Sequence, residues 1–444
     1  DIMTTSSKHP ETLALHGGSY RKDPTTNAVA VPIYQTTSYE FNSTEHAGNL
    51  FALKELGNIY TRIMNPTNAV LEERLAAIEG GAAALAVSSG QAASALSIQN
   101  VAQAGDNIVC STDIYGGTWN LFNNTLRAQG IDVRFADPSD PENFKKLTDD
   151  KTRAYYAETL PNPKLSVFPI EEVANIGRPL GIPLIVDNTA APLSCKPFEY
   201  GAAIVMHSMT KWIGGHGTSI GGIIIDGGNF DWTANPDRQP LFNQPDASYH
   251  GAVWGDVVPQ IFGVQIAFAI RARVVMLRDL GAAIAPQNSF NLIQGLETLP
   301  LRLKQHNSNA EQVADFLKAN EQISKITFPK FAQGKSKENA DKYLNGNYGS
   351  MIGIELKNGV QGGKAFIDAL ELHYHVANIG DARSLAIHPA STTHSQLTPD
   401  EQLKAGVTPG YVRLCVGLEH VEDIINDLKI GLDAASKVSK SQAA

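Results

Sequence analysis

The sequence is poor in the residues that stabilise secreted or metal-bound scaffolds. Its 444 residues include three cysteines, Cys110, Cys195 and Cys415, which lie far apart and in no metal-ligand spacing. They predict neither a disulfide framework nor a zinc site, and they favour a reducing, cytoplasmic location. Residues 1–10 are polar and offer no apolar stretch for a secretory signal, so we expect no export.

Long apolar runs and basic runs are also missing. The most apolar long window, residues 257–277, is interrupted by Pro259, Arg271 and Arg273, which indicates a buried helix rather than a membrane span. The net charge is -9, from 36 Lys and Arg against 45 Asp and Glu, without a basic patch of the kind that binds nucleic acid. We therefore expect neither a membrane nor a nucleic acid as a partner.

What is present is an alternation of strand and helix patterns. From residue 65 onward, short β-branched runs alternate with longer helical ones, which predicts an α/β fold with a mainly parallel sheet. Thr67 is expected to cap a helix that ends at Gly80, and a second helix is expected over residues 92–101. The predicted strands cover 84–87, 107–110, 133–135, 153–157, 184–186 and 203–206.

The pattern of expected helices and strands changes after residue 279. A smaller α+β unit is expected there, with helices over 309–319, 363–372 and 421–435 and strands over 324–328, 351–356 and 411–416. Residues before Tyr60 show little periodicity and would suit an arm lying on another surface. We predict an N-terminal arm over 1–60, a large domain over 61–278 and a small C-terminal domain over 279–444.

The most informative segment is a buried strand that ends in two hydroxyls and a lysine, Ser208, Thr210 and Lys211. Desolvation lowers the pKa of a lysine, and a neutral amine is what attacks an aldehyde to form a Schiff base. Taken alone, Lys211 is better interpreted as a side chain that reaches the surface. Its neighbours reverse that interpretation.

Three other segments suit a flat, phosphorylated cofactor. Asp187 ends a neighbouring apolar strand, where a carboxylate could keep a pyridine-type nitrogen protonated, although a cap is an equal interpretation. Residues 88–91 read SSGQ between a strand and a helix, and helix N-termini bind anions. Tyr115 could stack on a ring, although an isolated tyrosine more often just packs.

Together these segments resemble the cystathionine/methionine-metabolism family of pyridoxal-phosphate enzymes, from about residue 13 to the final helix. Residues 60–67 read YTRIMNPT, similar to the family's YxRxxNPT element. The resemblance implies an aspartate-aminotransferase-like (type I) fold and pyridoxal 5'-phosphate on Lys211. It also implies a homotetramer, a dimer of dimers in which Tyr60 and Arg62 reach the cofactor phosphate of the neighbouring subunit.

The resemblance assigns the remaining contacts residue by residue. Lys211 is the catalytic group, with Tyr115 as a helper in proton transfer. The cofactor contacts that it implies are Tyr60, Arg62, Ser89, Gly90, Gln91, Tyr115, Asn162, Asp187, Thr189, Ser208, Thr210 and Lys211. Asn162, Asn378 and Arg413 are assigned to the amino-acid substrate. Without the resemblance, Arg413 would be interpreted as an ordinary surface arginine.

Peripheral differences indicate one branch of this family. Gly116 follows Tyr115 where methionine γ-lyases usually have cysteine, and residues 378–381 read NIGD where many cystathionine enzymes have a serine. Extra segments lie around residues 50–58 and 227–250. All three features resemble the O-acetylhomoserine sulfhydrylase branch, transferases that make L-homocysteine and acetate from O-acetyl-L-homoserine and sulfide. Methanethiol is a second candidate nucleophile.

Other functions stay open at this stage. The nearest alternative is a cystathionine γ-synthase, or a cystathionine or methionine γ-lyase. A nucleotide-binding α/β protein is disfavoured because no G-x-x-x-x-G-K-[ST] motif occurs. A non-catalytic relative is disfavoured because every cofactor-contacting position that the family requires is filled.

Overall fold

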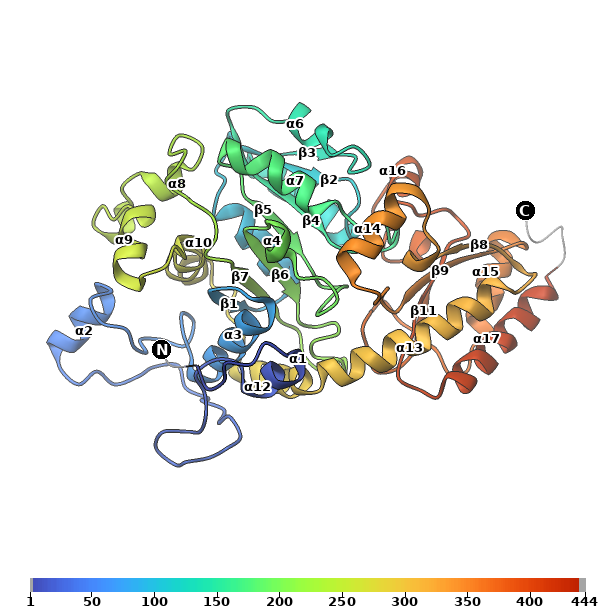
Figure 1. The fold of residues 1–444 in the computed structure, drawn as a ribbon, viewed down its shortest axis with the longest axis horizontal. Coiled ribbons are helices and arrows are strands. Elements are labelled where there is room, and N and C mark those ends of the chain that lie inside the picture. The colour runs from blue at the N-terminus through green and yellow to red at the C-terminus, as the bar shows by residue number, and fades with distance from the viewer. Residues whose placement is uncertain (1–2, 439–444) are drawn as a thin grey trace.

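The computed structural model describes residues 3–438 and contains two sheets, each with its own helices (Figure 1). The first sheet has seven strands in the order β1-β7-β6-β5-β4-β2-β3, and the second has five in the order β10-β11-β12-β9-β8. Strands β2 to β6 are parallel to one another, whereas β7 is antiparallel to both of its neighbours. The predicted α/β class, with a mainly parallel large sheet and a smaller C-terminal unit, is confirmed. The predicted domain boundaries stay predictions.

The strands lie close to their predicted positions. Those of the first sheet are β1 (Ala83–Val87), β2 (Asn107–Ser111), β3 (Asp132–Ala136), β4 (Thr152–Glu158), β5 (Leu184–Asp187), β6 (Ile204–Ser208) and β7 (Gly222–Asp226). Those of the second sheet are β8 (Ile323–Thr327), β9 (Met351–Leu356), β10 (Tyr374–His375), β11 (Leu385–Ile387) and β12 (Val412–Cys415). The sequence prediction missed β7, a short isoleucine run that follows two glycines, and the two short strands β10 and β11.

Helices cover both faces of the first sheet and one side of the second. Up to residue 280 they are α1 (Pro10–His16), α2 (Thr44–Phe51), α3 (Pro66–Glu79), α4 (Gly90–Gln99), α5 (Gly116–Asn120), α6 (Glu142–Lys146), α7 (Ile170–Gly177), α8 (Pro240–Asn243), α9 (Trp254–Phe262), α10 (Ala267–Arg271) and α11 (Arg278–Leu280). Those that follow are α12 (Pro286–Glu297), α13 (Leu299–Lys318), α14 (Gly334–Leu344), α15 (Gly359–Ala369), α16 (Pro399–Lys404) and α17 (Val421–Ser436). Two π-helical turns, Leu121–Leu126 and Ala272–Leu277, continue α5 and α10.

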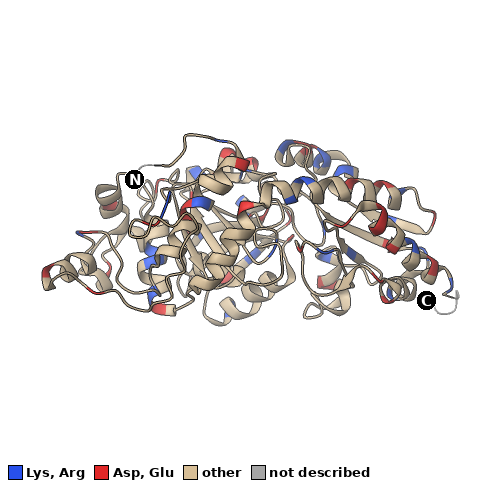
Figure 2. Ribbon diagram, turned by 90° about the horizontal axis from the view of Figure 1, so that it is seen from below, with Lys and Arg blue, Asp and Glu red and all other residues tan. Residues whose placement is uncertain are grey.

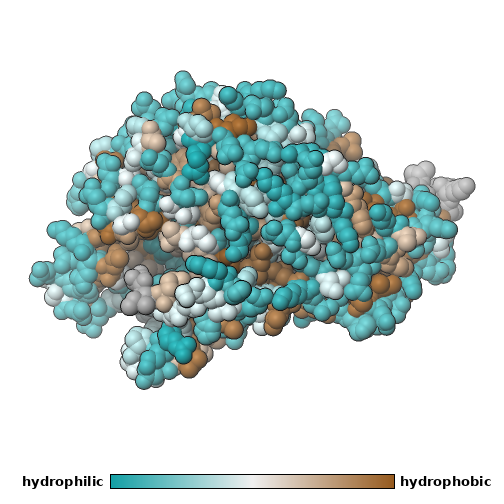
Figure 3. Space-filling view, viewed as in Figure 1, coloured by the Kyte–Doolittle hydropathy of each residue, from teal (hydrophilic) through white to brown (hydrophobic). Residues whose placement is uncertain are grey.

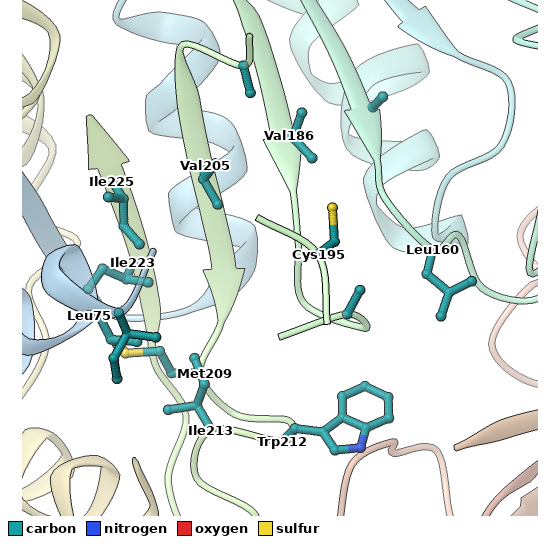
Figure 4. Close-up of a cluster of buried hydrophobic side chains, with 14 of the residues drawn as sticks. Leu75, Leu160, Val186, Cys195, Val205, Met209, Trp212, Ile213, Ile223 and Ile225 are labelled. Carbon is teal, nitrogen blue, oxygen red and sulfur yellow. The ribbon is translucent and has the colours of Figure 1, made fainter. Parts of the chain in front are cut away.

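Alternate residues of the central strands face different cores. Val186, Val205 and Ile225 point to the side covered by α3, α7 and α12 (Figure 4). Ile185 and Met206 point to the opposite side, which α4, α9 and α10 cover. Because both faces are buried, these strands are continuous apolar runs, and a polar residue at a strand end stands out in the sequence.

Helix α3 shows how a local signal sets an element boundary. The side chain of Asn65, and not that of Thr67 as predicted, caps the helix: Asn65 Oδ1 accepts the Thr67 N–H at 2.8 Å. Pro66 occupies the first helical position, which suits proline because the first amides of a helix have no partner inside it. The helix ends at Gly80 in the left-handed region, with φ of 75°. The predicted cap was therefore misplaced by two residues, whereas the predicted end at Gly80 was right.

Two helix predictions need correction. Helix α4 begins at Gly90 rather than residue 92, because Ser89 accepts the Ala92 N–H and caps it. The window 257–277 is not one helix: α9 ends at Gly263, with φ of 73°, and a new helix begins at Ala267. Residues 3–438 include no single helix long and apolar enough to cross a membrane. Trp254–Phe262 and Ala267–Leu280 reach that length only as a pair bent by 106°.

The two sheets are joined by α13, the long helix that runs from beneath the first sheet to the second (Figure 1). It begins at Leu299, ten residues before the helix predicted from the sequence.

Lys and Arg are interspersed with Asp and Glu over both units (Figure 2). Hydrophilic residues cover most of the face seen in Figure 3, with apolar residues in separate patches.

The second unit contains a buried carboxylate, Asp427 of α17, that pairs with a histidine. Asp427 Oδ2 contacts His373 Nδ1 at 2.6 Å and accepts the His373 N–H at 2.9 Å, while Oδ1 accepts the Glu371 N–H at 2.7 Å. Burial alone would raise the pKa of Asp427, but these hydrogen bonds outweigh it and hold the pKa well below its usual range. Because the folded-state pKa is depressed, the carboxylate stabilises the fold at neutral pH, and this stabilisation fades as pH falls below about 4.

We expect Asp427→Asn to lower the stability of the protein at pH 7 by about 2 kcal/mol, because hydrogen bonds to a buried charge are lost. The loss of stability of the native protein between about pH 5 and pH 3 should be shallower in this variant. Thermal unfolding at several pH values measures both effects. Asp433→Asn is the matched control on the same helix, since Asp433 is exposed and pairs only with Lys437 at 3.1 Å; equal losses in both variants would contradict the prediction.

Candidate active site

A cavity of about 650 Å³ lies at the carboxyl ends of β4, β5 and β6. Loops of the first unit form its floor and one wall, and residues 377–379 and 392–396 of the second unit form the other wall. Twelve of the residues predicted from the sequence line it: Ser89, Gly90, Gln91, Tyr115, Asn162, Asp187, Thr189, Ser208, Thr210, Lys211, Asn378 and Arg413. The fold thus gathers residues that are up to 324 positions apart, from Ser89 to Arg413, in one hollow.

Lys211 lies in the turn that follows β6. Its Nζ donates to Asn378 Oδ1 at 2.9 Å, so the amine points into the cavity rather than to the surface. Burial, and after it the positive charge of Arg413, lower the pKa of Lys211 to about 8. An appreciable fraction of the amine is therefore neutral at neutral pH, which a nucleophilic lysine requires.

Helix α13 holds the turn that carries Lys211. Arg302 donates to the carbonyl oxygens of Trp212 at 2.7 Å and Ile213 at 3.0 Å. One turn further along the same helix, His306 Nδ1 contacts the Val416 carbonyl oxygen at 2.7 Å, directly after β12. The lysine turn and the strand that carries Arg413 are therefore fixed to one helix.

Asp187 ends β5 with one oxygen engaged and the other lining the cavity. Its Oδ1 accepts the N–H of Thr189 at 3.0 Å and the hydroxyl of Thr189 at 2.5 Å. Thr189 Oγ1 in turn accepts the Ser208 N–H at 2.8 Å, which ties β5 to β6. Burial raises the pKa of Asp187, while the hydrogen bonds from Thr189 oppose the rise. A cation placed against this carboxylate would be bound strongly.

The N-terminus of α4 forms a tightly packed turn against β6 and β7. A Cβ on Gly90 would lie 2.6 Å from Ser208 Cβ, and a Cβ on Gly222 would lie 2.0 Å from the Ser89 carbonyl oxygen. No side chain fits at either glycine. The first amides of α4 therefore stay open to the cavity, and they and the helix dipole form a seat for an anion.

Two hydroxyl groups flank this seat. Ser208 lines the cavity at the end of β6, as predicted. Thr210 lines it too, but its hydroxyl accepts the Gly221 N–H at 3.1 Å and donates to the Gly221 carbonyl oxygen at 3.4 Å, so it must give up this donated bond to reach a ligand. The Ser89 hydroxyl accepts the Ala92 N–H as the cap of α4, and its hydrogen is available to a ligand.

Tyr115 and Asn162 form the wall opposite the sheet edge. The Tyr115 ring lies edge-on to His394, with centroids 6.5 Å apart, and remains 39% exposed. Asn162 is 5% exposed and its Oδ1 has no hydrogen-bond partner among the described residues. An unpaired buried amide oxygen is costly, and a ligand that donates to it would remove the cost.

Residue type alone suggested that Arg413 lies on the surface, but its side chain is buried. It is 3% exposed on β12, and its Nη2 donates to the Asn378 carbonyl oxygen at 3.1 Å. Asn378 therefore contacts the lysine through its side chain and the arginine through its backbone. A buried guanidinium beside the amine suits a carboxylate ligand, which it can bind by two parallel hydrogen bonds.

Tyr60 and Arg62 lie outside the cavity of their own chain. The Arg62 guanidinium lies over the Tyr60 ring, 5.0 Å from its centroid, and Nε donates to the Arg278 carbonyl oxygen at 3.1 Å. Tyr60 is 37% exposed. Both side chains thus lie at the surface of this chain, apart from the other predicted cofactor contacts.

Pyridoxal phosphate fits the residues that the cavity contains. The amides of the α4 N-terminus suit a phosphate, Asp187 suits a protonated ring nitrogen, the orphaned Asn162 oxygen suits a donor, and Lys211 suits an aldehyde. A metal site is not formed: within residues 3–438, no group of three or more His, Cys, Asp or Glu side chains could hold an ion.

The sequence prediction missed part of the cavity lining. Glu158 ends β4 as Asp187 ends β5, and the same signal, a carboxylate after a buried apolar run, identifies both. The other missed residues are Ser94, Thr118, Leu160, Ala190, Ile220, Ala377, Ile379, Thr392, Thr393 and Gln396. Those of the second unit have no local signal, because only the packing of the two units brings them to the cavity.

Known proteins resemble the chain over almost its whole length. The family described as Cys/Met metabolism PLP-dependent enzyme matches residues 11–433. An O-acetyl-L-homoserine sulfhydrylase of Leptospira meyeri is 54% identical over 95% of this chain and 96% of its own. An O-acetyl-L-homoserine sulfhydrylase of Thermus thermophilus is 50% identical over 95% of this chain and 99% of its own.

Solved structures agree with these relatives. A putative O-acetylhomoserine (thiol)-lyase of Campylobacter jejuni, which carries a pyridoxyl-lysine, superposes with a TM-score of 0.92 at 41% identity, over 96% of this chain and all of that one. A cystathionine gamma synthase of Xanthomonas oryzae in complex with cystathionine superposes with a TM-score of 0.81 at 29% identity, over 96% and 98%. The fold prediction is therefore confirmed at the level of the whole chain.

We expect the Lys211 amine, in protein stripped of any bound aldehyde, to be acetylated by acetic anhydride with a midpoint near pH 8. Lys342 is the internal reference, since its hydrogen bond to Glu171 raises its pKa and should move its midpoint to a higher pH. Peptide mass spectrometry of protein labelled over a pH series measures both residues at once. Equal midpoints would show that the cavity does not depress the pKa of Lys211.

Proposed function

Because this chain belongs to the Cys/Met metabolism PLP-dependent enzyme family, we propose that it is an O-acetyl-L-homoserine sulfhydrylase that uses pyridoxal phosphate on Lys211. It exchanges the acetate of O-acetyl-L-homoserine for sulfide and releases L-homocysteine. One observation carries the choice of reaction: sulfhydrylases are 54% and 50% identical to the chain, against 29% for a cystathionine gamma synthase. The cavity supplies the groups that this reaction needs.

The reaction breaks the bond between Cγ and the acetate oxygen and forms a bond from Cγ to sulfur. Pyridoxal phosphate, when bound, draws electrons from the amino acid and so acidifies its C–H bonds. Asp187 would support this by holding the ring nitrogen in its protonated form. The anion seat of α4, with Ser208 and Thr210, would hold the phosphate, and Tyr115 and Thr189 would hold the ring.

Lys211 moves the protons. Its pKa of about 8 lets the amine act as a base at Cα and return the proton at later steps. Asn378 holds the free amine through its Oδ1 at 2.9 Å and so limits where the amine can reach. Tyr115, whose ring lines the same cavity, assists the proton transfers.

Arg413 and Asn162 hold the substrate. The guanidinium of Arg413 binds the α-carboxylate and thereby fixes which bond at Cα faces the ring. Among the described residues that line the cavity, Lys211 and Arg413 are the only cations, and both have a role at Cα. A distal carboxylate on the leaving group would find no further cation in this chain, which favours an acetyl over a succinyl donor.

We expect kcat/KM for O-acetyl-L-homoserine with sulfide to exceed that for O-succinyl-L-homoserine by at least about 10-fold. Lys211→Ala should remove both turnover and the visible absorption of the bound cofactor. Steady-state assays of homocysteine formation test both statements, with cysteine and methanethiol as alternative nucleophiles. Cystathionine formation from cysteine as the main activity would favour the γ-synthase alternative, and full activity of Lys211→Ala would exclude the proposal.

We also propose that the active sites are shared between two subunits of a homotetramer. Tyr60 and Arg62 are the two predicted phosphate contacts that do not line the cavity of their own chain. Apolar side chains of the N-terminal segment 1–60 are exposed, among them Val29 at 83%, Phe51 at 61% and Leu56 at 64%. A second copy that covers this arm would bury these side chains and bring Arg62 to its phosphate. The three cysteines are free and buried, which supports a cytoplasmic location of the protein.

Shared sites predict complementation between inactive variants. Lys211→Ala co-expressed with Arg62→Ala should recover about a quarter of wild-type activity, because about half of the dimers are hybrids and each hybrid keeps one intact site. Lys211→Ala co-expressed with Arg413→Ala is the matched control, since both residues belong to the same subunit's site and no hybrid site is intact. Activity of purified mixtures measures the effect; equal recovery in both pairs would contradict shared sites.

A further inference from the structure

Glu158 is a buried carboxyl group beside the proposed cofactor that no step of the reaction uses. It ends β4, where its Cα pairs with that of Asp187 on β5, and it is 7% exposed at the cavity wall. Two carboxyl groups thus lie side by side at the edge of a buried sheet. Such a placement is costly unless hydrogen bonds or protonation relieve it.

The partners of Glu158 are backbone amides of two separate loops. Its Oε1 accepts the Tyr115 N–H at 2.9 Å, on the loop after β2. The backbone N–H of Asn162, on the loop after β4, lies close enough to the same carboxyl group to lower its pKa. An ion pair between Lys164 and Asp113, with Nζ and Oδ1 at 3.0 Å, ties the same two loops together. Glu158 therefore lies where the ring of Tyr115 and the amide of Asn162 are both positioned.

The charged and titratable groups that face Glu158 are acidic. Asp187 lies beside it on β5, Asp113 lies on the loop after β2, and Tyr156 and Cys110 interact with it from β4 and β2. Burial, and then the negative charge of Asp187, raise the pKa of Glu158 well above its usual value. A neutral carboxyl group can still accept hydrogen bonds from amides through its carbonyl oxygen. Its neutrality leaves Asp187 as the only anionic side chain among the described residues that line the cavity.

We propose that Glu158 is a positioning residue that acts as a neutral carboxyl group: it fixes Tyr115 and Asn162 against the cofactor and leaves Asp187 as the single negative charge among the described residues that line the cavity. This inference rests on the proposed function, because it takes pyridoxal phosphate as the occupant of the cavity. It assigns to Glu158 no contact with the reacting atoms. The role is to hold the wall that the ring packs against.

Four variants of the cofactor-loaded enzyme test the proposal. Glu158→Gln keeps a neutral acceptor of the same shape and should retain kcat within about 3-fold, a spread ordinary for a neutral replacement. Glu158→Ala removes the acceptor and should lower kcat roughly 100-fold with a much smaller change in KM. Glu158→Asp keeps an acid but withdraws it from the amides, so it should behave as Glu158→Ala does. Glu72→Gln is the matched control, a buried glutamate that accepts the Ala86 N–H at 2.7 Å far from the cavity lining.

The second readout is the visible circular dichroism of the bound cofactor without substrate. Because this signal reports the asymmetric packing of the ring, it should weaken in Glu158→Ala and Glu158→Asp and be restored in Glu158→Gln. It needs no turnover, so it stays informative even if the sulfhydrylase reaction itself is not observed. Glu72→Gln should alter thermal stability alone.

Two outcomes would overturn the proposal. If Glu158→Gln loses kcat and dichroism as fully as Glu158→Ala, the negative charge of Glu158 is what the site needs. If Glu158→Ala and Glu158→Asp keep both signals, the two loops hold their position without it. Should Glu158→Ala fail to fold, the contrast between Glu158→Gln and Glu158→Asp gives the same decision.

Discussion

The parallel alignment of β4, β5 and β6 is the constraint on which the cavity depends. Because these strands run in one direction, the residues that end them, Glu158, Asp187 and Ser208, lie at one edge of the sheet. Each strand is buried on both faces, so polar groups can appear only where it ends. The chemistry of the site is therefore concentrated along a line set by the sheet register.

Burial at this edge is what gives the groups their chemical character. The same loss of solvent lowers the pKa of Lys211 and raises those of Asp187 and Glu158. Local hydrogen bonds then distinguish two similar carboxyl groups. Thr189 donates a hydroxyl and an amide to Asp187, which stabilises its charge, whereas Glu158 receives amides of two loops. Similar residues at neighbouring strand ends thus acquire different properties.

The part of the site that depends on local pattern could be predicted from the sequence. Lys211, Asp187 and the turn at Ser89 each follow a buried apolar run, and the strands that carry them were placed within two residues. Boundaries set by side-chain capping were less predictable, because Asn65 and Thr67 are both good caps and Pro66 decides between them. Strand β7 was missed because a run of three isoleucines after two glycines is too short to show a periodicity.

The remainder of the site depends on contacts between segments far apart in the chain. Arg413 is indistinguishable from a surface arginine until β12 is placed beside β9 and β11. Asn378 was singled out by its resemblance to a family element, but its contact with the Lys211 amine follows only from the packing of the second unit on the first. Thr392, Thr393 and Gln396 reach the cavity only through the same packing. The predicted role of Tyr60 and Arg62, contact with the cofactor phosphate of a neighbouring subunit, requires a second copy of the chain.

Helix α13 has a consequence for how this protein can change during evolution. Arg302 holds the Lys211 turn, and His306, one turn away, holds the end of β12. A single helix therefore sets the spacing between the Lys211 amine and the Arg413 guanidinium. Loops elsewhere in the second unit can lengthen or diverge without altering that spacing. A single-residue deletion between Arg302 and His306 would rotate one anchor by about 100° relative to the other. Insertions and deletions are therefore selected against along the five residues from Arg302 to His306.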